Sequence, residues 1–415
     1  MSILIKDVLL DGRRTSIHVD GNRITGVGSK DKAEFVLDGR GKAAIPGLVN
    51  THTHAAMTLL RGYADDVILQ EWLEKFIWPV EAKMTGEDVY WGTRLACLEM
   101  IKSGTTCFND MYWHLEGAVK AVEESGIRGV MNSVFIDRFS KDKSREQWRE
   151  AERQLKDIKT SPRVKLALGP HAIYTVTEES LRWAKEYSDR HGTLIHFHLS
   201  ETKKEVDDCI KDHGKRPVEY LNDIGFLGPN LLCAHSVWLN EEEIRILAQH
   251  EVKVAHCPTS NMKLSVGAAL NNEGLRKAGV TVSLGTDGCS SNNNLDMFES
   301  MKTAALLQKM VWNNPTLLPA KEAFRMATLD GARSLKIDAG RLEEGALADI
   351  VLIDMKSPQL TPCHNLISNL VYSANGGCVD TVICDGKMIM EGRKVEGEEE
   401  LMEKVSEVAK DLTTR

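Results

Sequence analysis

The chain has few cysteines for its length and no motif that would pair them. Its nine cysteines are scattered over 415 residues, and the closest two, Cys378 and Cys384, are six positions apart, so no CxxC pair occurs. This spacing excludes a disulfide scaffold and a zinc ribbon. Unpaired thiols are typical of a reducing compartment, and we therefore expect a cytoplasmic protein.

An excess of basic residues is also absent. The 52 Lys and Arg residues are outnumbered by 60 Asp and Glu residues, which leaves a formal net charge of −8. A protein that binds a nucleic-acid backbone needs a basic face, so this balance argues against a nucleic-acid partner.

Long apolar runs are missing as well. The N-terminal sequence MSILIKDVLLDGRR has no apolar segment followed by a small-residue cleavage site, so no signal peptide is expected. The longest uncharged stretches, 43–60 and 357–379, are interrupted by His, Asn, Thr, Pro and Gly. Neither stretch is expected to span a bilayer, and no membrane partner is predicted.

The two ends of the chain both read as short strands joined by tight turns. The composition is that of a globular protein, 42% hydrophobic and 27% charged. Asp-Gly pairs separate the apolar runs near the start of the chain, and Asp385-Gly386 does so near its end. Such pairs favour hairpins, because both turn residues need positive φ. Neither end can bury a core alone, so we predict that residues 1–48 and 340–415 form one small β-sandwich domain.

A different pattern covers residues 49–339. Strand candidates that look fully buried alternate there with amphipathic helices, which is typical of parallel βαβ units. Eight such units in about 290 residues predict a (β/α)8 barrel of the TIM type, with a doubly wound open sheet as the alternative. The strand candidates are LVNTHTH, TTCFNDM, GVMNSVF, KLALGPHA, LIHFHLSE, LLCAHSV, VKVAHCP and VTVSLGTDG.

Residues that can do chemistry gather at the carboxyl ends of these strands. Barrel enzymes build their active sites on this face, and His and Glu are otherwise uncommon in buried strands. The clustering therefore supports both a barrel and an active site within it. The residues are His52, His54, Asn109, Asp110, His171, His198, Glu201, His235, His256 and Asp287.

His52 and His54 are the first two ligands of a predicted metal site. Their spacing of two places both imidazoles on the same side of a strand, which in a barrel is the interior. His198 and Asp287 at the same face complete a set of three His and one carboxylate, which suits Zn²⁺, with Fe²⁺ as an alternative. His196 shares the parity of His198, so parity leaves the choice between them open. We take His198 as the ligand because it is nearer the strand end.

One metal ion per chain is expected. A second ion would need a bridging carboxylate or a modified lysine, and the strand that ends in His171 offers neither at its carboxyl end. We interpret His196 as a hydrogen-bonded interior residue and His256 as a supporting or structural residue.

Several segments together resemble a known family. PGLVNTHTHAAMTLLRG, GPHAIY, HFHLSET, AHSVWL and LGTDGCSSNN are similar to segments of the amidohydrolase superfamily. Within it they resemble the deaminases of methylthioadenosine and S-adenosylhomocysteine, including the archaeal 5′-deoxyadenosine deaminase group. The resemblance runs through nearly the whole chain. It implies a metal-dependent hydrolytic deaminase that converts an adenosine derivative into its inosine counterpart and ammonia.

The resemblance also implies roles for individual residues. Glu201 would be the general acid, Asp287 the base, and His235 the residue that orients the attacking hydroxide. Glu201 and Asp287 would also contact the purine. Glu81, in PVEAKM, would hold the ribose hydroxyls, and His171 would contact the nucleoside. The implied metal ligands are His52, His54, His198 and Asp287.

The loop after the third predicted strand departs from the family pattern. Some relatives have arginines there that meet a homocysteine carboxylate, whereas this sequence has Ser133 at one such position. Arg145 is the candidate for another, and Arg138 lies nearby. The departure favours a 5′-deoxyadenosine-like or broad substrate range over a preference for S-adenosylhomocysteine.

Two other interpretations remain open. One is an amidohydrolase that acts on guanine, a pterin, cytosine or a triazine, and the other is a metal-free binding paralogue. The resemblance further implies a nucleoside as the small-molecule partner, a homo-oligomer (dimer or tetramer) and a place in purine salvage.

Overall fold

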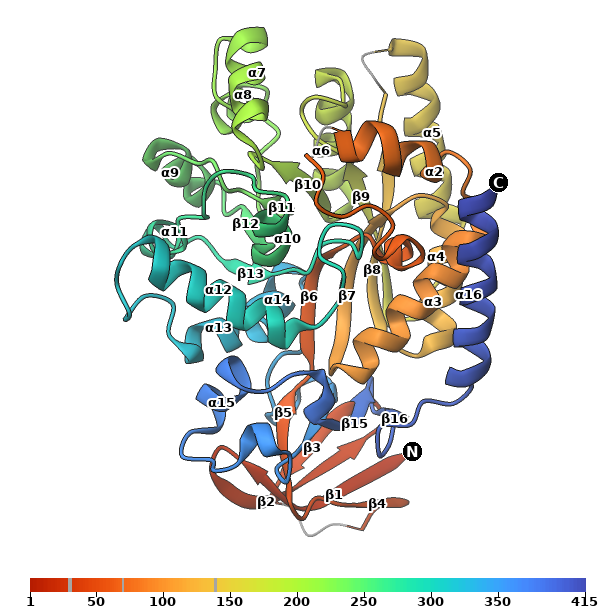
Figure 1. Cartoon of the computed structure of the whole chain (residues 1–415), viewed down its shortest axis with the longest axis vertical. Helices are drawn as coiled ribbons and strands as arrows, with labels where there is room; N and C mark the ends of the chain where they lie inside the picture. Colours follow the sequence, from red (N-terminus) through yellow and green to blue (C-terminus); the bar gives the residue numbers. More distant parts are fainter. Residues whose placement is uncertain (29–31, 69–70, 138–139) are drawn as a thin grey trace.

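The central part of the molecule is a parallel barrel. The computed structural model describes residues 1–28, 32–68, 71–137 and 140–415 (Figure 1). Eight parallel strands pair in sequence order, as the barrel prediction requires. They are β6 (Leu48–Thr53), β7 (Thr105–Tyr112), β8 (Arg128–Phe135), β9 (Val164–Pro170), β10 (Ile195–Leu199), β11 (Leu231–His235), β12 (Lys253–His256) and β13 (Val282–Leu284).

The first and last barrel strands approach each other and nearly close the ring. The Thr51 hydroxyl donates a hydrogen bond to the Leu284 carbonyl at 2.9 Å. The Asp287 N–H donates to the His52 carbonyl at 3.0 Å. Every residue of β6 is buried, as expected for a parallel strand covered on both faces.

Helices on the outside of the barrel begin and end at residues suited to those positions. Thr177 caps α6 by accepting a hydrogen bond from the Ser180 N–H, and Gly192, at φ 70°, ends the helix. The covering helices are α3 (Gly86–Lys102), α4 (Leu115–Ser125), α5 (Lys141–Asp157), α6 (Glu178–His191), α7 (Lys203–His213), α8 (Pro217–Asp223), α9 (Glu241–Gln249), α10 (Pro258–Lys263), α11 (Asn272–Ala278), α12 (Met297–Val311), α13 (Ala320–Met326) and α14 (Leu329–Ser334).

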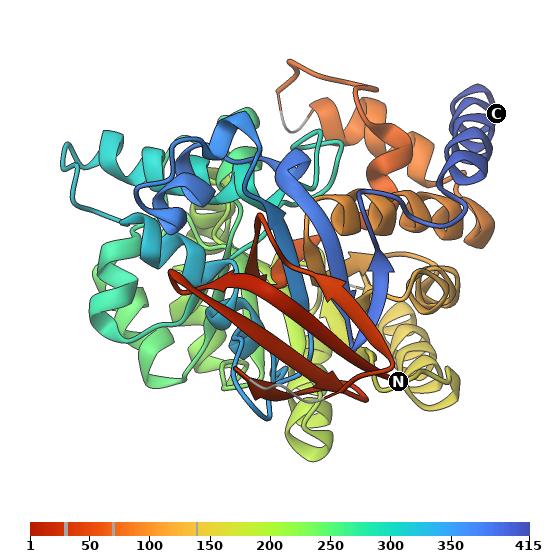
Figure 2. The same ribbon diagram turned by 90° about the horizontal axis from the view of Figure 1, so that it is seen from below.

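The two ends of the chain meet, as predicted, and they form one mixed sheet rather than a sandwich of two. Its order is β16-β15-β14-β5-β1-β2-β3, with β4 paired to β1, and the antiparallel pair β14–β5 joins the ends. The N-terminal strands cross the C-terminal ones (Figure 2). The strands are β1 (Ser2–Leu10), β2 (Arg13–Asp20), β3 (Arg23–Val27), β4 (Phe35–Asp38), β5 (Lys42–Pro46), β14 (Ile350–Asp354), β15 (Val379–Cys384) and β16 (Lys387–Met390).

This terminal sheet has an apolar core of its own, to which both ends contribute, for example Ile5, Ile17 and Ile350. The last helix, α16 (Glu398–Thr414), leaves the sheet and packs along α3 of the barrel (Figure 1). Its buried face, which includes Leu412, joins the large core of the barrel. The domain boundaries 1–48 with 340–415, and 49–339, stay a prediction.

The sheet leads directly into the barrel through β5 and β6, so the carboxyl ends of the barrel strands lie away from the sheet (Figure 1). No helix of the described residues is long and apolar enough to cross a membrane. The nine cysteines all fall in the described ranges and are free thiols.

Candidate metal centre and active site

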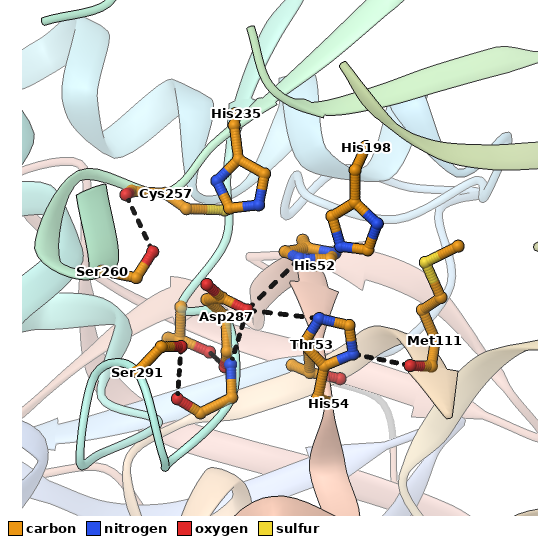
Figure 3. Close-up of polar contacts among 12 residues, drawn as sticks. His52, Thr53, His54, Met111, His198, His235, Cys257, Ser260, Asp287 and Ser291 are labelled. Carbon is orange, nitrogen blue, oxygen red and sulfur yellow. Dashed lines mark hydrogen bonds and ion pairs between the residues drawn. The ribbon is translucent and has the colours of Figure 1, made fainter. Parts of the chain in front are cut away.

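Four imidazoles and one carboxylate converge at the carboxyl ends of the barrel strands. His52 lies in β6 and His54 follows it directly, His198 lies in β10, and His235 is the last residue of β11. Asp287 follows β13 by three positions. Their side chains point toward one another (Figure 3), which is the clustering that the sequence predicts.

Both histidines of the first strand are oriented by hydrogen bonds at Nδ1. His54 Nδ1 lies 2.6 Å from the carbonyl oxygen of Met111 (Figure 3). Because a carbonyl can only accept, Nδ1 carries the proton and the lone pair of neutral His54 lies on Nε2. His52 Nδ1 contacts Nε2 of His196 at 2.7 Å.

The other two imidazoles are held in a similar way. His198 Nδ1 donates to the carbonyl oxygen of His171 at 3.0 Å. His235 Nδ1 lies 2.9 Å from Oδ1 of Asn261. With Nδ1 occupied, Nε2 of each ring is the nitrogen free to face the centre, and a fixed tautomer of this kind is what metal-binding histidines require.

Asp287 faces the two histidines of the first strand. Its Oδ1 lies 3.4 Å from Nε2 of His52 and 3.4 Å from Nε2 of His54. Burial alone would raise the pKa of this carboxyl, but the nearby imidazoles of His52, His54 and His235 hold it well below its usual range. Burial lowers the pKa of His52 to about 4. Near neutral pH the site therefore combines a carboxylate with a neutral imidazole.

Two of these residues occupy an unusual backbone conformation. His235 has φ 66° and Asp287 has φ 67°, in the left-handed region that non-glycine residues seldom adopt. Such strain costs about 1–3 kcal/mol per residue and persists where the surrounding structure enforces it. Here it turns both side chains back over the end of the barrel.

The chemistry of this donor set fits a divalent metal ion. One ligand atom from each of His52, His54 and His198 lies within 4.8 Å of the others, and the same holds for His52, His235 and Asp287. Nε2 of His52 is buried and has no hydrogen-bond partner among the described residues. A buried nitrogen lone pair without a donor costs free energy unless something binds it, and neutral imidazole with carboxylate suits Zn²⁺ or Fe²⁺.

Glu201 and His235 form a pair beside this cluster. Glu201 Oε2 lies 3.9 Å from Nε2 of His235, and the two side chains are 14% and 2% exposed. Burial raises the pKa of Glu201. Burial would lower the pKa of His235, but the charges of Glu201 and Asp287 outweigh it and raise that pKa. Each group therefore holds its proton to a higher pH than in water.

The loop that presents Glu201 is fixed by a second glutamate. Glu205, in the first turn of α7, accepts hydrogen bonds from the N–H groups of Ser200 at 2.7 Å and Glu201 at 2.9 Å. Burial raises the pKa of Glu205 to about 7. Glu205 is not among the residues predicted from the sequence, where the available signal is a second glutamate four residues after a candidate acid.

Glu81 and His171 border the same centre. Glu81 ends the short helix α2 (Trp78–Glu81) and accepts a hydrogen bond from the Tyr112 hydroxyl at 2.7 Å. Burial raises the pKa of Glu81 and lowers that of His171 to about 3. The His171 ring lies 4.7 Å from that of His198, between centroids. Tyr112, whose hydroxyl fixes Glu81, was not anticipated from the sequence.

Three of the strand-end residues have other positions or partners than expected. Asn109 and Asp110 lie inside β7 rather than at its end, and Oδ1 of Asp110 accepts hydrogen bonds from the Thr53 hydroxyl at 2.9 Å and the Ala55 N–H at 2.7 Å. It therefore ties the first two barrel strands together. His256 ends β12 fully buried, and neither of its nitrogens has a hydrogen-bond partner among the described residues.

Arg145, the arginine predicted to contact the substrate tail, is not brought to this centre. Arg145 is exposed on α5, in a row of charged side chains that includes Glu146 and Arg149. Arg138 lies outside the described residues. Ser133 lies in β8 and donates a hydrogen bond to Gln154 Oε1 at 2.7 Å. The substrate-tail contact of Arg145 therefore stays a prediction.

Comparison with known proteins adds three findings on sequence. The amidohydrolase family model matches residues 43–389. The chain is 52% identical over 402 residues to 5-methylthioadenosine/S-adenosylhomocysteine deaminase 1 of Archaeoglobus fulgidus, covering 96% of this chain and 95% of the relative. It is 49% identical over 408 residues to 5′-deoxyadenosine deaminase of Methanothermobacter thermautotrophicus, covering 97% and 95%.

A solved structure is similar to this one over the whole chain. An adenosine deaminase of Xanthomonas campestris with bound zinc superposes with a TM-score of 0.94 at 34% identity, covering 100% of this chain and 99% of that one. The similarity includes the barrel and the terminal sheet together, so the two-part architecture is that of the related chain.

Proposed function

The chain belongs to the amidohydrolase family, and from that premise we propose that it is a metal-dependent deaminase of adenosine derivatives. The reaction replaces the 6-amino group of the purine by oxygen and releases ammonia. The observation that carries the proposal is the pair Glu201 and His235 beside the cluster of Nε2 atoms and Asp287. Relatives about half identical to this chain are named as deaminases of such nucleosides.

One metal ion per chain would be held by His52, His54, His198 and Asp287. A divalent ion in such a site supplies a water molecule activated at neutral pH. Zn²⁺ is the ion we propose, supported by the imidazole-rich donor set and by the zinc in the related adenosine deaminase.

The proton transfers are assigned to the residues whose pKa shifts favour each role. Asp287, kept ionised, accepts a proton from the attacking water as oxygen bonds to C6. Glu201, whose pKa burial raises, gives a proton to N1, which allows the ring to accept the new bond. His235, with Nδ1 held by Asn261, directs Nε2 at the reacting centre and orients the water. The proton held by Asp287 then passes to the amino group, the proton of the new C6 hydroxyl returns to Glu201, and ammonia leaves as the C6–N bond breaks and the C6 carbonyl forms.

Positioning of the nucleoside is proposed for the groups around the cluster. Glu81, fixed by Tyr112, would accept hydrogen bonds from the ribose hydroxyls. His171 would contact the nucleoside beside the metal ligands, where its ring already lies against His198. Holding C6 in place lowers the barrier by pre-organisation. Arg145 is retained as the proposed contact for the 5′ substituent.

The cellular setting follows from the same premise. We propose that the enzyme is cytoplasmic. Its nine free thiols support this location, because unpaired thiols are typical of a reducing compartment. A homo-oligomer, dimer or tetramer, and a role in purine salvage are proposed with it, both by analogy with relatives.

The proposal is tested by comparing kcat/KM for 5′-deoxyadenosine, methylthioadenosine, S-adenosylhomocysteine and adenosine with the zinc-loaded protein, using ammonia release as the readout. Guanine, cytosine, a pterin and a triazine serve as controls. We expect turnover of the four adenosine derivatives, with S-adenosylhomocysteine not preferred. Turnover of a control compound in place of all four would overturn the assignment.

A further inference from the structure

His196 lies deep in the barrel, two residues before His198 on β10, and is 1% exposed. Its Nε2 contacts Nδ1 of His52 at 2.7 Å, and its Nδ1 contacts the carbonyl oxygen of Leu232 at 3.0 Å. His52 belongs to the first barrel strand and Leu232 to the sixth. The His196 ring therefore bridges the barrel interior from β10 to β6 while also bonding to its neighbour β11.

The direction of these two hydrogen bonds is determined by the Leu232 carbonyl. A carbonyl oxygen only accepts, so His196 carries its proton on Nδ1, and Nε2 of the neutral ring has a lone pair. The contact at 2.7 Å then requires His52 to donate from Nδ1. His52 is thereby left with an unprotonated Nε2, the buried atom without a hydrogen-bond partner that lies 3.4 Å from Asp287 Oδ1.

We propose that His196 is a positioning residue that fixes the tautomer and ring orientation of His52 and so sets the affinity of the site for its metal ion. The inference rests on the proposed metal site, but not on the identity of the substrate. His54 and His198 are oriented by backbone carbonyls, of Met111 and His171. His52 differs from them because its orienting partner is a side chain, and a substitution can therefore remove it.

Two substitutions of His196 separate this role from simple packing. In His196→Gln, the amide offers one acceptor to His52 and one donor to Leu232, so the proton arrangement is preserved. In His196→Leu, the side chain fills a similar space but cannot accept a hydrogen bond from His52. Phe197→Leu is the matched control, since Phe197 is a neighbouring, fully buried residue of the same strand that packs on Phe226. Successive side chains of a strand point to opposite faces, so Phe197 points away from His52.

The measurement is the zinc affinity of the full chain, determined by competition with a chelator in the absence of substrate. Loss of an outer partner of a metal ligand weakens binding about 10–100-fold, and we expect this for His196→Leu. His196→Gln should stay close to wild type, and Phe197→Leu should lower the melting temperature without changing zinc affinity. Wild-type affinity in His196→Leu, or an equal loss in His196→Gln and Phe197→Leu, would overturn the proposal.

A spectroscopic measurement keeps the proposal testable if His196→Leu does not fold. In the cobalt-loaded wild-type protein, each imidazole that binds through Nε2 shows a strongly shifted, exchangeable Nδ1 proton in the NMR spectrum. We expect such a proton for His52, protected from exchange by His196 and exchanging faster in His196→Gln. Absence of a shifted His52 Nδ1 proton contradicts the tautomer. Neither zinc affinity nor the His52 proton signal depends on deaminase activity. A protein without deaminase activity would therefore contradict the proposed function but not the proposed role of His196.

Discussion

At the scale of single residues, Glu201 and His235 each have a raised pKa, and the two groups are coupled because the ionised form of Glu201 is one of the charges that favour a proton on His235. Burial disfavours the carboxylate of Glu201 and raises its pKa. For His235, burial acts in the opposite direction but the carboxylates of Glu201 and Asp287 outweigh it. A glutamic acid with a raised pKa is better able to protonate a purine nitrogen than an exposed glutamate, which is ionised near neutral pH.

Replacing Glu201 by Gln keeps the shape of the side chain and removes its acidic proton. We expect the variant to retain its metal ion, because Glu201 is not in the proposed ligand set, and to lose about 10²–10⁴-fold in kcat. Metal content and single-turnover rates of the two proteins provide the measurement. Turnover equal to wild type at equal metal content would remove Glu201 from the acid role.

Replacing Tyr112 by Phe leaves Glu81 without its hydroxyl donor. A hydrogen bond to a charged group contributes about 1.5–3 kcal/mol, so we expect KM for 5′-deoxyadenosine to rise about tenfold or more as Glu81 becomes misplaced. The proton-transfer groups are untouched, so kcat should change little. A fall in kcat with unchanged KM would show that Tyr112 acts elsewhere than on ribose binding.

At the scale of elements, the end of β8 is tied to α5 and α6 by one buried carboxylate. Asp137 accepts hydrogen bonds from the hydroxyls of Ser144 at 2.8 Å, Thr177 at 2.6 Å and Ser180 at 2.6 Å, and from the Thr177 N–H at 2.9 Å. Burial would raise the pKa of Asp137, but these donors outweigh it and lower the pKa. The carboxylate is therefore the form that joins the strand end to the helix N-terminus.

This network predicts a pH-dependent effect of Asp137→Asn. Because the folded pKa lies below the unfolded value of about 3.9, the carboxylate stabilises the fold above that pH, and the stabilisation is lost as pH falls through the folded pKa. We expect the variant to be less stable than wild type by about 2 kcal/mol at pH 7. Denaturant unfolding should show this difference shrinking below about pH 4. A difference independent of pH would mean that charge is not involved.

The elements that sequence analysis located best are those with clear end signals. Among the amphipathic helices expected between the predicted strands are α4 and α6, each of which is followed by a glycine in the left-handed conformation. The residues at the strand ends converge because the carboxyl ends of parallel strands meet at one face of a barrel. Short helices such as α10 and α14 lack a long amphipathic pattern and were not predicted.

Contacts between distant segments could not be predicted from sequence in the same way. Asn261 and Tyr112 hold His235 and Glu81, but neither follows from spacing, because each depends on how two loops or strands are placed in space. His196 was expected to be hydrogen-bonded in the interior, and the structure identifies the partner as His52 across the barrel.

At the scale of the whole molecule, one buried ion network joins the barrel to the terminal sheet. Arg128, at the start of β8, donates to both oxygens of Asp349, at 3.1 Å each, and to Asp385 at 3.0 Å. Arg128 is 5% exposed and Asp349 is 1% exposed. Both carboxylates are far from Arg128 in sequence. Asp349 lies immediately before β14, and Asp385 lies in the turn between β15 and β16.

Removing Arg128 should destabilise the chain strongly. In Arg128→Met the carboxylate of Asp349 stays buried without its cation, and we expect a loss of about 3–5 kcal/mol. The double variant Arg128→Met with Asp349→Asn should recover part of it, because the buried charge is then removed. Thermal unfolding of the three proteins is the measurement. No recovery in the double variant would show that packing, rather than the unpaired charge, causes the loss.

The central claim, that this chain hydrolyses the amino group from an adenosine derivative, is tested most directly by turning over 5′-deoxyadenosine in H₂¹⁸O with the zinc-loaded protein and analysing the products by mass spectrometry. We expect one ammonia for each product molecule, and a 5′-deoxyinosine that carries ¹⁸O at C6 with the glycosidic bond intact. Unchanged nucleoside, or free adenine without ammonia, would contradict it.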